Sequence, residues 1–144
     1  MNARRIWIAL GLAVAFIALA IVANNVKHPP SSQAITCIDP VKGCLFTYRG
    51  EPAHLRFSSP PVSMQPFVLE VQAPGASHVH AEAHMVGMDM GFNRYDLRPT
   101  RPGVFAAQLR LPVCASGRRD WTLYLEVGQD RYALAFKSQG QREE

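Results

Sequence analysis

The sequence predicts an all-β protein: an antiparallel β-sandwich behind one N-terminal transmembrane helix. Residues 6–23 carry no charged or polar side chain. The remainder of the chain consists of short β-prone runs separated by turn residues, and no stretch after residue 26 has a helical periodicity. With 144 residues, of which 48% are hydrophobic and 18% charged, the chain is expected to form one domain, and a largely disordered protein is excluded.

The apolar segment 6–23 has the length of a membrane span. A helix of 18 residues covers roughly 27 Å, close to the ~30 Å thickness of a hydrocarbon core. Two arginines precede the segment, and the next cation is Lys27, so residues 1–5 are expected in the cytoplasm and the remaining chain in the periplasm. A cleaved signal peptide is the alternative, because Ala18-Leu19-Ala20 has the small-x-small pattern of a cleavage site. If the segment is not cleaved, the protein is expected to be a single-pass protein of the inner membrane.

The exported part is predicted to start with a tether at 24–33, which contains a proline pair and a serine pair. The sandwich is expected to span 34–137, followed by a polar tail at 138–144. Seven runs in the sandwich are β-prone: 45–48, 54–57, 67–72, 78–85, 105–111, 121–127 and 131–136. Turn signals separate them, among them 98–103 and a hairpin loop at 128–130. This pattern favours an immunoglobulin-like or a cupredoxin-like sandwich without separating the two, with aromatic core residues at Phe105, Trp121, Tyr124 and Phe136.

Charge and motifs exclude several functions. Without the two arginines ahead of the apolar segment, 13 Lys and Arg residues oppose 11 Asp and Glu. The cations are scattered, so we expect no nucleic-acid partner. The sequence has no motif typical of serine hydrolases, zinc proteases or nucleotide-binding enzymes, so we do not expect an enzyme.

The chain has three cysteines, an odd number for a protein in an oxidising compartment. Cys37 and Cys44 flank residues that bend the chain, which predicts a local disulfide worth about 2 kcal/mol. A redox-active or metal-binding dithiol is the alternative. Cys114 then remains single, and it is either a small buried side chain or a metal ligand.

A segment rich in histidine and methionine, 78–90, contains three of the five histidines and three of the five methionines. If 78–85 is a strand, then His78, His80, Glu82 and His84 share one face. Met88 and Met90 follow in a glycine-flanked turn, where core filling is less natural than in a strand. Thioether and thiolate sulfurs select Cu(I), and imidazole binds copper in either oxidation state. We therefore predict Met88, Met90, Cys114 and His84 as copper ligands, with Cu(I) favoured.

The exported part resembles the YtkA/FixH-like group of small membrane-anchored proteins. The residues that carry the resemblance are Met88-Asp89-Met90-Gly91, Asn93-Arg94, Leu97, Leu111-Pro112 with Cys114, and Trp121. The resemblance implies an immunoglobulin-like domain behind an anchor and a role in copper handling or respiratory oxidase assembly. The three histidines of 78–84 depart from the pattern of that group.

The sequence therefore leaves three functions open. The first is transfer of Cu(I) to a respiratory oxidase subunit or another copper chaperone. The second is an assembly module of a membrane complex that binds no metal, with Met88 and Met90 filling the core or an interface and Cys114 buried. The third is a Cu(II) or Zn(II) buffer that uses the histidine face, above all His78 and His80, and loses metal as the pH falls through about 6.5.

Overall fold

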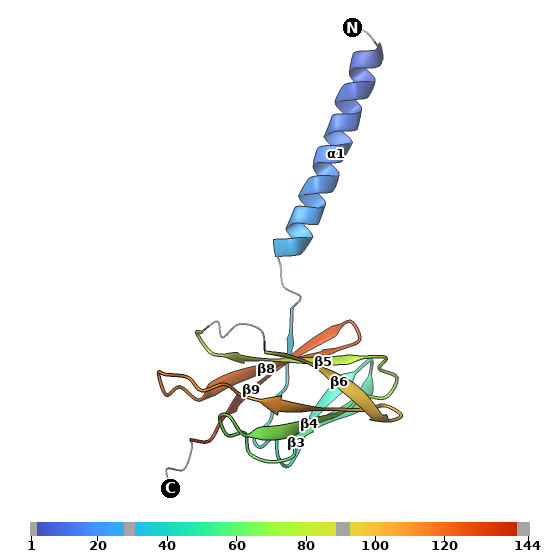
Figure 1. Ribbon diagram of the computed structural model, residues 1–144. Coiled ribbons are helices and arrows are strands. Elements are labelled where there is room, and N and C mark those ends of the chain that lie inside the picture. The colour runs from blue at the N-terminus through green and yellow to red at the C-terminus, as the bar shows by residue number, and fades with distance from the viewer. Residues whose placement is uncertain (1–2, 28–30, 89–92, 141–144) are drawn as a thin grey trace. The chain divides into compact units, whose positions relative to one another are not determined.

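The computed structural model describes residues 3–27, 31–88 and 93–140, and the chain divides into two compact units, Met1–Ser31 and Ser32–Glu144 (Figure 1). The first unit contains helix α1 (Ala3–Lys27), which includes the apolar segment 6–23 and continues beyond both of its ends. Within the described part of the chain, no helix is both long and apolar enough to traverse a membrane. The transmembrane anchor therefore stays a prediction.

The second unit is a mixed β-sheet that curls into two layers (Figure 1). Nine strands lie in the described residues: β1 (Gln33–Ala34), β2 (Cys44–Tyr48), β3 (Glu51–Phe57), β4 (Pro66–Gln72), β5 (Val79–Met85), β6 (Arg94–Arg101), β7 (Val104–Arg110), β8 (Asp120–Val127) and β9 (Asp130–Lys137). Their order is β1-β9-β8-β5-β6-β7-β4-β3-β2. The predicted all-β class is confirmed. The expectation of a purely antiparallel sheet is wrong at one point, because β1 pairs with β9 in parallel.

Strand β6 connects the two layers. Its first half pairs with β5, and its second half, from Arg98, pairs with β7. The register shifts between Pro99 and Arg101, where proline offers no N–H to a ladder. The turn predicted for 98–103 is therefore wrong over most of its length: strands continue to Arg101 and resume at Val104.

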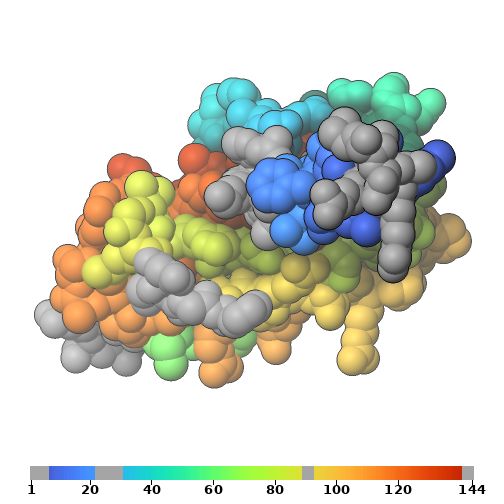
Figure 2. Space-filling model, turned by 90° about the horizontal axis from the view of Figure 1, so that it is seen from above, coloured from blue at the N-terminus to red at the C-terminus, as the bar shows by residue number. Residues whose placement is uncertain are grey.

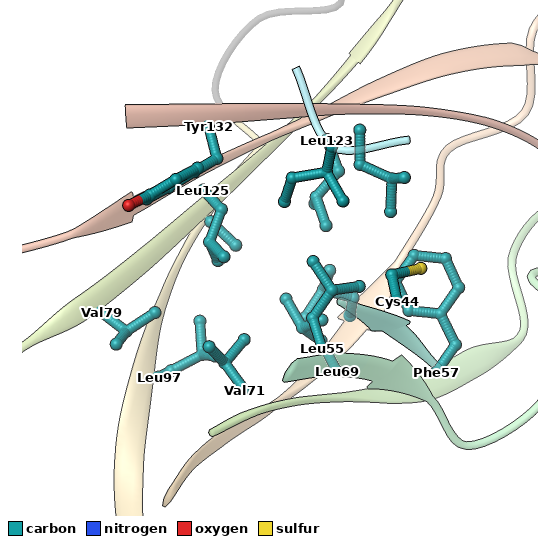
Figure 3. Close-up of a cluster of buried hydrophobic side chains, with 14 of the residues drawn as sticks. Cys44, Leu55, Phe57, Leu69, Val71, Val79, Leu97, Leu123, Leu125 and Tyr132 are labelled. Atoms are coloured by element: carbon teal, nitrogen blue, oxygen red, sulfur yellow. The ribbon is translucent and has the colours of Figure 1, made fainter. Parts of the chain in front are cut away.

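The core lies between the two layers. Buried and partly exposed residues alternate along β5 and β8, as the sequence pattern predicted. Figure 3 shows buried side chains from both layers pointing into the space between them, among them Val79, Leu123 and Leu125 from one layer and Leu55, Leu69 and Val71 from the other. Of the four aromatic residues predicted for the core, Phe105, Trp121 and Phe136 are buried. The prediction is wrong for Tyr124, which alternates with buried residues of β8 and faces outward.

Two local features stabilise the sandwich. The predicted disulfide between Cys37 and Cys44 is present and closes the loop before β2. The hairpin predicted at 128–130 is also confirmed, because Val127 pairs with Asp130 across a two-residue loop. Its first residue, Gly128, has a φ of 60°, a value that glycine adopts without steric cost.

A tyrosine hydroxyl links the two layers at one edge. Tyr132 of β9 donates a hydrogen bond to the backbone carbonyl of Thr47 in β2, with a distance of 2.9 Å. Its ring also packs against Phe46, with 4.8 Å between the ring centroids. The ring is buried, and burial, followed by the charge of Asp130, raises the pKa of the Tyr132 hydroxyl above its usual value.

Candidate metal site

We use the name methionine turn for residues 86–88, which follow β5 and include Met88. The pairing of β5 with β8 determines where this turn lies. The two strands are antiparallel and in register from Val79↔Val127 to Met85↔Trp121. The turn that follows Met85 therefore lies beside the segment that enters β8, and the N–H of Val86 donates to the carbonyl of Asp120 at 3.1 Å. In Figure 2 the yellow-green surface of the β5 region is next to the orange surface of the region around β7 and β8. Two loops that are distant in sequence thus meet at one end of the sandwich.

A glycine shapes the methionine turn. Gly87 has a φ of 78°, in the left-handed region that other residues rarely adopt. The N–H of Met88 then donates back to the carbonyl of Met85 at 3.2 Å. As a result, the Met88 side chain leaves the strand and is 42% exposed. Core filling, the ordinary role of methionine, does not describe this residue.

The turn places a thioether beside a thiol. The Sγ atom of Cys114 lies 3.4 Å from the Sδ atom of Met88, close enough for the thiol to donate a weak hydrogen bond to the thioether. Cys114 belongs to the loop between β7 and β8, and it is partly exposed. Two of the four predicted copper ligands, 26 residues apart in sequence, are therefore in direct contact.

The loop around Cys114 favours the thiolate form of its side chain. The hydroxyl of Ser116 lies 2.9 Å from the Cys114 sulfur, and the N–H of Gly117 donates to the Cys114 carbonyl at 3.1 Å. The hydroxyl and backbone N–H of Ser116 lower the pKa of the Cys114 thiol, with smaller contributions from the backbone and charge of Arg118; desolvation acts in the opposite direction. The thiolate is the form of cysteine that binds metals.

Ser116 and Arg118 were not among the residues that the sequence singled out. The signal that could have revealed Ser116 is its position two residues after a cysteine, followed by a glycine that permits a tight turn. For Arg118 no sequence signal was present. Its guanidinium lies at the methionine turn, 3.3 Å from the position that a Cβ atom on Gly87 would occupy.

The Sγ atom of Cys114 and the Sδ atom of Met88 are called the sulfur pair below. The structure does not place the other two predicted ligands beside it. Met90 lies outside the described residues. His84 points outward from β5, where its Nε2 atom lies 3.3 Å from a carboxylate oxygen of Glu82. Its ring also packs edge-on against Tyr124 with 5.3 Å between the ring centroids. The structure thus joins Met88 and Cys114, while the hydrogen bond of His84 goes to a carboxylate and not to either sulfur.

The outer face of β5 carries an ion-pair network. Side chains of His80, Glu82 and His84 alternate with buried neighbours, as the sequence predicted. Glu82 contacts Arg94 at 3.2 Å and Arg131 at 3.6 Å. Both arginines also contact Glu126, at 3.4 and 3.6 Å, and Arg131 lies over the ring of Tyr124.

The two remaining histidines of the segment have partners as well. The ring nitrogens of His78 lie 3.0 Å from the carbonyl of Gly128 and 2.9 Å from the hydroxyl of Ser77. The Nδ1 atom of His80 forms a hydrogen bond with a carboxylate oxygen of Asp96. Among the described residues, no three His, Cys, Asp or Glu side chains form a group that could hold a metal ion. Of Met88 and Cys114, only the cysteine belongs to these four residue types.

Comparison with known proteins found no match among protein-family models, curated proteins or solved structures. The resemblance to the YtkA/FixH-like group therefore stays a prediction.

Proposed function

We propose that this protein binds Cu(I) through the sulfur atoms of Cys114 and Met88 and transfers it to another protein. The observation that carries the proposal is the 3.4 Å contact between the Cys114 thiol and the Met88 thioether, where the loop after β5 meets the loop before β8. Soft sulfur donors select Cu(I) over harder divalent ions. Ser116 supports this role because its hydrogen bonds favour the thiolate, which supplies one negative charge for a monovalent cation.

The coordination shell would be completed by the two other predicted ligands. Met90 follows Met88 by two residues and offers a second thioether, and His84 is the nearest predicted imidazole in sequence. Both ligands are part of the proposal. Since methionine and histidine bonds to copper exchange readily, such a site suits transfer better than catalysis.

We further propose that the protein is held at the periplasmic face of the inner membrane by residues 6–23. Eighteen apolar residues, preceded by two arginines, support an anchor with this orientation. The disulfide between Cys37 and Cys44 supports an oxidising compartment. An acceptor in the same compartment, such as a respiratory oxidase subunit or another copper chaperone, would receive the metal.

The strand order supports an immunoglobulin-like topology over a cupredoxin-like one. One layer contains β9-β8-β5 and the other β7-β4-β3, which corresponds to the two sheets GFC and EBA of an immunoglobulin sandwich. In this topology the loops after β5 and before β8 emerge at the same end. Met88 and Cys114 then lie in two loops that the pairing of β5 with β8 brings together.

A Cu(I) titration of the full chain in a neutral detergent, under anaerobic conditions and against a competing chelator, tests the proposal. We expect one tightly bound Cu(I), and a loss of affinity of more than about tenfold in Cys114→Ser and in Met88→Leu. Val86→Ala is the matched control, because Val86 lies in the same turn with a similar exposure, 46%, but offers no donor. Its affinity should be unchanged.

The outcome also separates the proposal from its alternatives. Failure to bind Cu(I), or equal affinity in the wild type and in Cys114→Ser, would reject the site and leave the metal-free assembly module. If binding were instead lost in a His78→Ala and His80→Ala double variant and kept in Cys114→Ser, the histidine face would be the site.

A further inference from the structure

The surface around the sulfur pair combines apolar and basic side chains. Val86 and Val113 are 46% and 53% exposed, and each is close in sequence to one of the two sulfur residues. Both stand in loops and not on a buried strand face, so these side chains are available for contact. Exposed apolar side chains beside a functional group are typical of a protein–protein contact.

One arginine, Arg118, borders this apolar surface. It is exposed, and it forms no ion pair with any residue that the structure describes. The neighbouring carboxylate, Asp120, pairs with Lys137 instead, at 3.6 Å. The guanidinium of Arg118 lies against the Gly87 turn, directly beside the proposed site. The rim of the site therefore has a positive charge that the described part of the protein leaves uncompensated.

We propose that Val86, Val113 and Arg118 form a docking surface for a metal-accepting protein whose own copper ligands are flanked by acidic residues. This inference rests on the proposed function, because transfer requires the two ligand sets to come within bonding distance. The two valines would then exclude water from the contact. Guanidinium groups bind carboxylates through paired hydrogen bonds and orient the partner. A small contact of this kind is weak and transient, as transfer requires.

Two synthetic acceptor peptides test the surface. Both carry the same Met-x-x-Met ligand pair, flanked at identical positions by glutamate in one peptide and by lysine in the other. The full chain, loaded with Cu(I) in neutral detergent, is mixed anaerobically with each peptide, and the transfer rate is measured by stopped flow. We expect transfer to the glutamate peptide to be at least about tenfold faster at low ionic strength, with the difference shrinking as salt is added.

Charge reversal shows whether the surface itself is responsible. The variant Arg118→Glu should invert the preference between the two peptides. The ratio of the two rates is the readout, because a change in the Cys114 pKa affects both peptides alike. The matched control is Arg98→Glu, at an exposed arginine of β6 that also lacks an ion pair among the described residues. It should keep the preference of the wild type.

Failure of the proposed function and failure of this inference give different results. If the chain does not take up Cu(I), the proposed function is wrong, and the surface cannot serve Cu(I) transfer. If Cu(I) binds but both peptides receive it at equal rates, the docking surface is rejected while the metal site stands. An equal inversion by the β6 control variant would also reject it, because net charge and not this surface would then set the preference.

Discussion

Replacement of Gly87 by alanine tests whether the methionine turn holds the proposed site. The φ of this residue is 78°, where an L-residue costs roughly 1–2 kcal/mol. A Cβ atom would approach Arg118 at 3.3 Å, and this contact is relieved cheaply because the partner is the end of a flexible side chain. The main cost is therefore backbone strain.

The strain either lowers the stability of the protein or changes the conformation of the turn, and each effect can be measured. If the turn keeps its conformation, the free energy of unfolding falls by the full 1–2 kcal/mol, about 4 °C in melting temperature per kcal/mol for a sandwich of this size. If the turn relaxes, Met88 moves away from Cys114, and the conformation that binds copper becomes a minor state. The Cu(I) affinity then falls by a factor of up to about 5–30, which corresponds to the same 1–2 kcal/mol.

Gly75→Ala is the matched control. Gly75 has the same φ of 78°, and a Cβ atom there would meet nothing within 4 Å. Thermal unfolding and the Cu(I) titration are run on both variants. We expect Gly75→Ala to lose stability and to keep its affinity, and Gly87→Ala to lose affinity. Equal affinities in wild type and Gly87→Ala, together with a full loss of stability, would show that the turn tolerates the strain; an affinity loss in Gly75→Ala as well would refute the reasoning.

Three further predictions concern single contacts. In Ser116→Ala the pKa of the Cys114 thiol should rise, since the hydrogen bonds that lower it come first from Ser116, and the pH profile of alkylation by iodoacetamide should shift to higher pH. Reduction of the bond between Cys37 and Cys44 should lower the free energy of unfolding in urea by about 2 kcal/mol, given a loop of seven residues. Tyr132→Phe should cost about 1 kcal/mol at pH 7 through the lost bond to Thr47. Because the pKa of Tyr132 is raised in the folded state, its contribution is present below about pH 10 and is lost as the pH rises further, so the variant should lose less stability at alkaline pH than the wild type.

The strands that the sequence predicted correctly are those with one buried face. In β4, β5 and β8 every second side chain enters the core, and burial imposes the alternation that makes a strand visible in sequence. Strand β6 lacks this signal, because Leu97 is its one fully buried residue and Pro99 interrupts the pattern. Strand β1 has two residues and is too short for any period. These are the two strands that were missed.

For the candidate site, the sequence indicates which side chains could bind a metal but not how they are arranged in space. The donor atoms of Met88 and Cys114 could be chosen from residue type, since a methionine in a glycine-flanked turn and an unpaired cysteine are unusual. Their contact could not be predicted, because it depends on the non-local pairing of β5 with β8. The role of Ser116 was hidden for another reason: serine is common in turns, and only the structure shows that its hydroxyl faces the sulfur.

The structure also distinguishes energetically between the two places where a metal could bind. On the outer face of β5, the carboxylate of Glu82 already holds His84, Arg94 and Arg131. A divalent ion bound there would have to compete with these contacts, and an ion that bound Glu82 would deprive Arg94 and Arg131 of this counter-charge. Among the described residues, the polar contacts at the sulfur pair are a weak thiol hydrogen bond, a serine hydroxyl that favours the thiolate, and the backbone of Arg118. Binding of Cu(I) by Cys114 and Met88 would therefore displace little more than the thiol proton. Recruitment of His84 as a further ligand would break its 3.3 Å contact with Glu82, whose ion pairs with Arg94 and Arg131 would remain.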